Sequence, residues 1–138
     1  MAQDLTKFYE VVKENSDLRT MMHAKRWTRA TLQTLGINLP KAAKQAMARS
    51  LPDELSSYLT DVWWMLPVRD PNIEAHDFSA RVARRAGNTD PRYAKLVSEA
   101  VFGAVKGTIE TDVAQQVRDG LSPDLRKMWE SADIQAVF

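Results

Sequence analysis

The chain has 138 residues, of which 44% are hydrophobic and 27% are charged, and its formal net charge is +1 at pH 7. These values are typical of a globular protein and exclude a disordered chain, while the absence of cysteine excludes disulfides, thiolate metal sites and cysteine nucleophiles. Because no apolar run approaches the roughly 20 residues of a membrane span and the first residues lack a signal-peptide pattern, we expect a cytoplasmic protein without membrane insertion.

The first half of the chain carries the start signals of four helices. Asp4 is a candidate cap for the opening helix, and Asp17 or Thr20 for the second. Pro40 begins the third helix, and the run Leu51-Pro52-Asp53-Glu54-Leu55 begins the fourth. No sustained alternation of β-branched residues predicts a strand.

An apolar joint follows over residues 62–77, which includes Trp63, Trp64, Met65 and Leu66. These side chains have two interpretations. The favoured one is a wedge that fixes the angle between two helical bundles. The other is an exposed apolar interface for self-association or for a partner helix.

The second half has sharper helix signals. Asp77 is a candidate cap for a helix that begins at Phe78, and Gly87 is placed to end that helix in the left-handed conformation. Asp90 and Pro91 predict a cap and a first helical residue, with the helix running to Gly107. Thr111 is a candidate cap for a shorter helix that ends at Gly120. Ser122 and Pro123 open the last one, and the tail from Ile134 to Phe138 either packs along it or docks elsewhere.

The two halves match each other at a constant offset. Residues 8–61 align without a gap on residues 78–131, 70 positions later, with identities such as Phe8 with Phe78 and Leu55 with Leu125. The apolar positions coincide more widely than the identities do. This periodicity predicts an all-α fold, a tandem duplication of an approximately four-helix unit, as two stacked helical bundles. The predicted divisions are a first repeat over 1–61, the joint over 62–77, and a second repeat with the tail over 78–138.

Three stretches resemble a known family. The run from Phe78 to Gly87, the turns Leu51-Pro52-Asp53-Glu54-Leu55 and Leu121-Ser122-Pro123-Asp124-Leu125, and the aromatic pair Trp63-Trp64 resemble motifs of the prokaryotic domain of unknown function 2267 family. The resemblance covers nearly the whole chain. It implies an all-helical tandem fold with no assigned activity, and therefore no catalytic residues to transfer.

The residues themselves give no positive sign of catalysis. His23 and His76 lack the spacing of a helical metal pair, no glycine run forms a phosphate-binding loop, and no serine lies in a nucleophile elbow. Gly103 and Gly107 are spaced for close helix packing. We expect a protein without catalytic, cofactor or metal sites.

The charge distribution distinguishes the two halves. Residues 18–52 contain no acidic residue and carry a formal charge of +7, whereas the matching residues 88–122 carry four cations and five carboxylates. The helical periodicity places the first-half cations on outer faces, and these seven residues are called the basic face: Arg19, Lys25, Arg26, Arg29, Lys41, Lys44 and Arg49.

Such a face suits several partners. It could meet nucleic acid phosphates, an acidic protein, or the acidic second half of another copy, and a solvated face without a partner is equally compatible with the pattern. The preferred hypothesis is a non-enzymatic helical interaction or scaffold module that self-associates. The alternative is a nucleic-acid-associated protein that uses the basic face.

Overall fold

The computed structural model describes residues 5–60, 70–88 and 90–137. These residues form helices and connecting turns with no strand, which confirms the all-α prediction. No described helix has the length and apolarity needed to cross a membrane. The described helices are α1 (Thr6–Ser16), α2 (Met21–Ile37), α3 (Lys41–Ser50), α4 (Asp53–Thr60), α5 (Ala75–Arg85), α6 (Pro91–Lys106), α7 (Thr111–Gly120) and α8 (Pro123–Ser131).

Local side-chain capping accounts for three of the eight described helix starts. The side chains of Thr20, Asp90 and Ser122 accept hydrogen bonds from backbone amides in the first turns of α2, α6 and α8. Each bond satisfies a donor that the helix itself leaves unpaired. Asp17, the other candidate for α2, instead ends α1 in the left-handed conformation with φ of 57°. The predicted cap Asp4 lies outside the described residues.

Helix α5 ends as predicted but begins earlier than predicted. Gly87 has φ of 77°, and the amide of Asn88 donates to the Ala83 carbonyl, which closes the last turn. The helix begins at Ala75, so Asp77 lies in its first turn and does not cap a start at Phe78. The Ala75 amide donates to the side chain of Asp124 in α8. A carboxylate distant in sequence thus caps α5.

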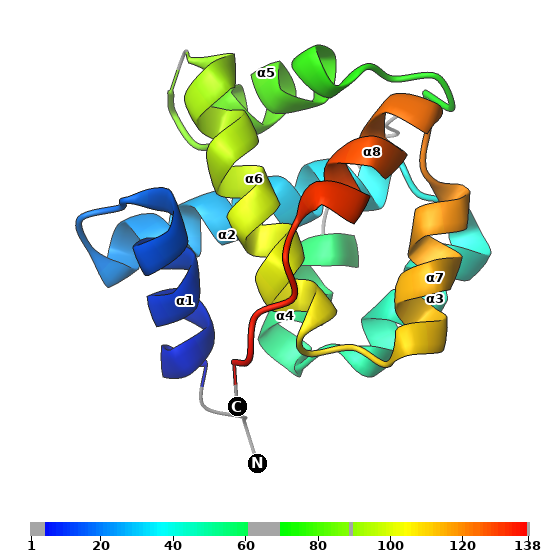
Figure 1. The fold of residues 1–138 in the computed structure, drawn as a ribbon, viewed down its shortest axis with the longest axis horizontal. Coiled ribbons are helices and arrows are strands. Elements are labelled where there is room, and N and C mark those ends of the chain that lie inside the picture. Colours follow the sequence, from blue (N-terminus) through cyan, green and yellow to red (C-terminus); the bar gives the residue numbers. More distant parts are fainter. Residues whose placement is uncertain (1–4, 61–69, 89, 138) are drawn as a thin grey trace.

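The helices of the two halves interleave (Figure 1). Helix α1 packs against α6, and α5 packs against α2, so the first helix of each half lies on the second helix of the other half. Helix α3 packs against α7. Exchanging the two halves converts the α1–α6 pair into the α5–α2 pair and leaves the α3–α7 pair as it is. The arrangement is compatible with the duplication, which stays a prediction together with its divisions at 1–61, 62–77 and 78–138.

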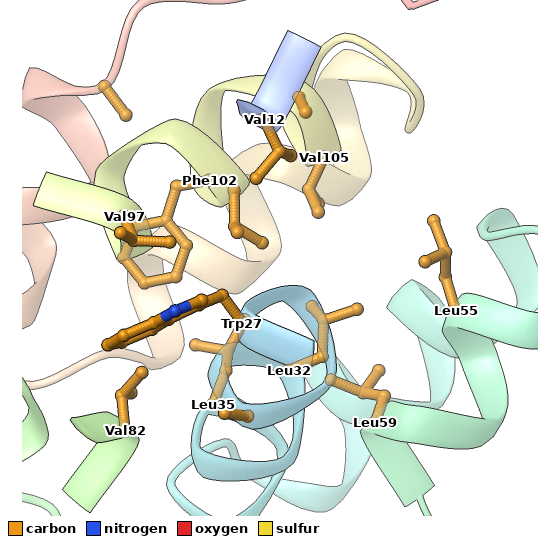
Figure 2. Close-up of a cluster of buried hydrophobic side chains, with 14 of the residues drawn as sticks. Val12, Trp27, Leu32, Leu35, Leu55, Leu59, Val82, Val97, Phe102 and Val105 are labelled. Carbon is orange, nitrogen blue, oxygen red and sulfur yellow. The ribbon is translucent and has the colours of Figure 1, made fainter. Parts of the chain in front are cut away.

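One hydrophobic core contains residues from both halves. Figure 2 shows Trp27 of α2 between Val82 of α5 and Val97 of α6. The Trp27 ring also meets the Tyr93 ring edge to face, with the ring centroids 5.4 Å apart. The Trp27 side chain is only 5% exposed. Trp27 belongs to the first half and is therefore buried among residues of second-half helices.

The halves differ in how the second and fourth helices meet. Gly36 of α2 lies so close to α4 that an added Cβ would be 2.0 Å from the Leu59 carbonyl oxygen. At the position 70 residues later, Lys106 of α6 donates to the carbonyls of Trp129 and Ala132, at 2.8 and 2.6 Å. A direct backbone contact in one half therefore corresponds to a lysine bridge in the other.

The tail after α8 returns along α6 (Figure 1). The amide of Gln135 donates to the Gly103 carbonyl at 3.0 Å. Added Cβ atoms on Gly103 and Gly107 would lie 2.3 and 1.7 Å from the carbonyl oxygens of Asp133 and Gln135. The predicted small-residue pair thus receives the tail and not another helix, and the tail packs on α6 with Val137 buried.

Candidate functional site

The basic face is divided between two helices. Lys25, Arg26 and Arg29 belong to α2, and Lys41, Lys44 and Arg49 belong to α3, whereas Arg19 lies in the turn before α2. All seven side chains are exposed except that of Lys44, which is half-buried. Partial burial lowers the pKa of Lys44, because it penalises the charged ammonium.

Helical periodicity positions the three α2 cations. Ala24, Trp27 and Thr28 point into the core, so the intervening positions 25, 26 and 29 face outward. This confirms the predicted outward placement of Arg26 and Arg29. The three side chains lie within little more than one turn of α2, which concentrates their charge on one surface.

These three cations line a cleft between α2 and α5 with a volume of about 560 Å³. We call it the α2–α5 cleft. Tyr58 of α4 and Gln33 of α2 supply polar side chains to its wall. The remaining lining residues are Ala30, Arg85, Ala86 and Gly87. Among the described lining residues there is no carboxylate, and four of them, Lys25, Arg26, Arg29 and Arg85, carry positive charges.

Arg85 is the cleft cation that lies outside the predicted basic face. It ends α5, and its guanidinium donates to the Thr34 hydroxyl of α2 at 3.3 Å. Partial desolvation and then the like charges of Arg81 and Arg84 lower its pKa. The helix dipole already favours arginines in a last helical turn, so the sequence gives no separate functional signal for Arg85. Arg85 differs from Arg84 because the packing of α5 on α2 places it at the cleft.

A second contact holds Lys25 at the edge of the cleft. Its ammonium lies 5.5 Å from the centre of the Tyr9 ring, within the range of a cation–π interaction. The Tyr9 hydroxyl donates to Glu54 at 2.7 Å. Burial, followed by hydrogen bonding to Glu54, raises the pKa of Tyr9 above its usual value. Tyr9 therefore remains a neutral phenol that packs under Lys25.

The four cleft cations lack acidic partners. Within residues 5–60, 70–88 and 90–137, none of Lys25, Arg26, Arg29 and Arg85 forms an ion pair. Two cations outside the cleft do form such pairs: Arg92 lies 3.8 Å from Asp90, and Arg118 lies 3.0 Å from Asp119. The positive charge of the cleft is therefore available to a ligand.

The other candidate residues are not part of this cleft. Lys41, Lys44, Arg49 and Arg19 do not line it. The predicted apolar interface of Trp63, Trp64, Met65 and Leu66 lies outside the described residues, so its prediction stands as made. Among the described residues, no group of three or more histidine or acidic side chains is placed to hold a metal ion.

Comparison with known families gives a match over most of the chain. The model of a family described as "Uncharacterized conserved protein (DUF2267)" matches residues 6–128. The match covers all eight described helices except the last residues of α8. No curated protein matches the chain significantly.

Proposed function

We propose a function for this chain, which belongs to the DUF2267 family of uncharacterized conserved proteins. We infer that it is a non-enzymatic interaction module whose basic face binds an acidic protein surface. The preferred acidic surface is the second half of another copy, so that the protein self-associates.

The observation that carries this proposal is the uncompensated charge of the first half. Lys25, Arg26 and Arg29 of α2 have no acidic partner in the described ranges, whereas Arg92 and Arg118 of the second half each have one. Packing of the core requires none of these exposed cations. Unpaired like charges close together repel one another, and an acidic surface that binds there relieves this repulsion.

The second half offers an acidic surface for such a contact. Helices α7 and α8 carry four exposed carboxylates, Asp112, Asp119, Asp124 and Glu130, among the three cations Arg118, Arg126 and Lys127, which leaves a small excess of negative charge. A contact between the basic face of one copy and these helices of the next is heterologous, and it generates a ring or an open chain. Because both surfaces are exposed, salt is expected to weaken the contact.

The test is the mass of the protein in solution, measured by sedimentation equilibrium at low and high salt. We expect species larger than the 15.6 kDa chain at low salt and a shift towards the monomer at high salt. The double variant Arg26→Glu with Arg29→Glu is expected to be monomeric under both conditions. The control is Lys95→Glu, which reverses an exposed charge at the position that matches Lys25 in the second half.

Two results would contradict self-association through the basic face. One is a monomeric wild-type protein at every concentration. The other is a Lys95→Glu variant that dissociates as fully as the double variant, because the effect would then follow net charge and not the face.

The predicted apolar interface gives another route to self-association. If Trp63 or Trp64 contributes to it, Trp63→Ala or Trp64→Ala yields a folded protein of smaller mass. If these residues form the predicted wedge between the halves, the same substitutions cost core packing free energy and lower the unfolding temperature. Circular dichroism measured beside the mass separates the two interpretations.

A nucleic acid is the second candidate partner. The observation in its favour is that the exposed cations continue from α2 to Lys41 and Arg49 of α3, beyond the cleft. A long polyanion can neutralise several such cations at once. A titration with duplex DNA and with RNA is expected to show affinity that falls steeply with salt. Lys41→Glu with Arg49→Glu should reduce the slope of that dependence if these residues contact phosphates.

A further inference from the structure

We propose that the α2–α5 cleft is a binding site for a small oligophosphate, a ligand with two or more linked phosphoryl groups. The site shares Lys25, Arg26 and Arg29 with the proposed protein-docking function. It does not depend on that function, because a monomer contains the whole cleft.

The charge of the cleft selects a multiply charged anion. Two helices contribute four cations, and Arg26, Arg29 and Arg85 carry guanidinium groups that can donate two hydrogen bonds to one phosphoryl group. A single monovalent anion would leave most of this charge uncompensated. The like charges of Arg81 and Arg84 around Arg85 add to the positive potential that a ligand would relieve.

The shape of the cleft selects a small ligand. Its volume of about 560 Å³ falls within the roughly 300–1,000 Å³ of small-molecule pockets. Ala30, Ala86 and Gly87 line it with minimal side chains, which leaves room between the cations of α2 and Arg85 of α5. The flat surface of a protein partner would contact the rim of such a hollow and leave its interior empty.

A matching cleft without these cations lies between α1 and α6. Asn15, Leu96, Glu99 and Ala100 line a cavity of about 150 Å³. In the 70-residue offset, these four residues correspond to Arg85, Arg26, Arg29 and Ala30. Ser131 at the end of α8 and Ala132, Asp133 and Gln135 of the tail complete its wall. The packing of the helices therefore yields both clefts, but only one of the two is lined by arginines.

This comparison separates packing from ligand recognition. If packing alone determined the cleft residues, the matching residues Leu96, Glu99 and Asn15 would serve equally well at positions 26, 29 and 85. At the matching positions the chain has an alkyl side chain (Leu96), a carboxylate (Glu99) and an amide (Asn15). The helices therefore pack without any of the three arginines. The arginines are therefore free to recognise a ligand.

The test is isothermal titration calorimetry of the full chain with inorganic tripolyphosphate. We expect one binding site per chain, with affinity that falls as salt is added. Arg29→Gln and Arg85→Gln are each expected to weaken binding by about tenfold or more, because each removes charge-assisted hydrogen bonds. Arg29→Lys should retain part of the affinity, since it keeps the charge. The control Lys95→Gln removes an exposed cation outside the cleft and is expected to change the affinity less than about twofold.

Two further ligands define the chemistry. Orthophosphate should bind much more weakly than tripolyphosphate, because it engages fewer of the four cations. Adenosine triphosphate should bind at least as well as tripolyphosphate if the biological ligand is a nucleotide, and less well if it is an inorganic oligophosphate. Either order of affinity supports the site, and the order shows whether the biological ligand is a nucleotide or an inorganic oligophosphate.

The proposal is overturned if tripolyphosphate does not bind at low salt, if orthophosphate binds equally well, or if Lys95→Gln weakens binding as much as the arginine variants do. Circular dichroism of each variant confirms that its fold is intact. The mass in solution distinguishes this inference from the proposed function. A monomer that binds tripolyphosphate in the cleft supports the site and contradicts self-association. An assembly that does not bind tripolyphosphate supports self-association and contradicts the site.

Discussion

At the scale of single residues, Gly36 is the position where the fold tolerates least change. An added Cβ would lie 2.0 Å from the Leu59 carbonyl oxygen, a backbone atom that can move only if α4 moves. We expect Gly36→Ala to destabilise the protein by about 3 kcal/mol, because overpacking outweighs the roughly 1 kcal/mol gain in helix propensity. Urea unfolding measures this difference. Gln45→Ala on the exposed surface of α3 is the control, and equal stability of the two variants would contradict the close contact.

Buried hydroxyl groups give a second residue-scale prediction. The Thr28 hydroxyl is fully buried without a hydrogen-bond partner in the described residues, as is that of Ser98 at the matching position. Thr28→Val keeps the shape and removes the unpaired group, so we expect about 1 kcal/mol of stabilisation. Thr31, which is equally buried, donates to the Trp27 carbonyl at 2.8 Å. Thr31→Val should therefore lose about 1 kcal/mol in the same unfolding experiment. Equal effects of the two substitutions would contradict this assignment.

At the scale of elements, the tail is held on α6 by backbone contact. The Gln135 amide donates to the Gly103 carbonyl, and Gly107 leaves room for the Gln135 carbonyl. We expect Gly107→Ala to displace the tail, so that the Gln135 amide exchanges with solvent about tenfold faster or more. The amides of α2 should keep their protection. Hydrogen exchange followed by nuclear magnetic resonance measures both, and Gln116→Ala on exposed α7 is the control. An unchanged exchange rate at Gln135 would show that the tail adapts to the new side chain.

The elements also show how far the sequence predicts the structure. Helix ends that depend on neighbouring residues were predictable, as at Gly87, Asp90 and Ser122, because capping is a local interaction. The start of α5 was not predictable, since Asp124 caps it from a distant part of the chain. The cleft follows the same rule. Periodicity placed Arg26 and Arg29 outward, but it could not bring Arg85 beside them, which depends on the packing of α5 on α2.

At the scale of the whole molecule, the shared core determines how the protein unfolds. The Tyr93 hydroxyl of α6 donates to the Ser16 carbonyl of α1 at 3.1 Å, and Trp27 packs among residues of α5 and α6. Neither half can bury its apolar surface without the other. The free energy of each half therefore depends on contacts between the halves, which makes a single cooperative transition the expected behaviour.

Trp27 provides the sharpest test of this coupling. We expect Trp27→Ala to cost about 3–5 kcal/mol, the usual range for removing a large buried aromatic ring. Because the ring contacts both halves, amides of α4 and of α8 should lose protection at the same urea concentration in the wild type. They should also lose it together, at a lower concentration, in the variant. Hydrogen exchange at increasing urea concentrations measures both regions in one sample. If the two halves instead lose protection at separate concentrations, they are independent folding units that only touch, and the core is not a single cooperative structure.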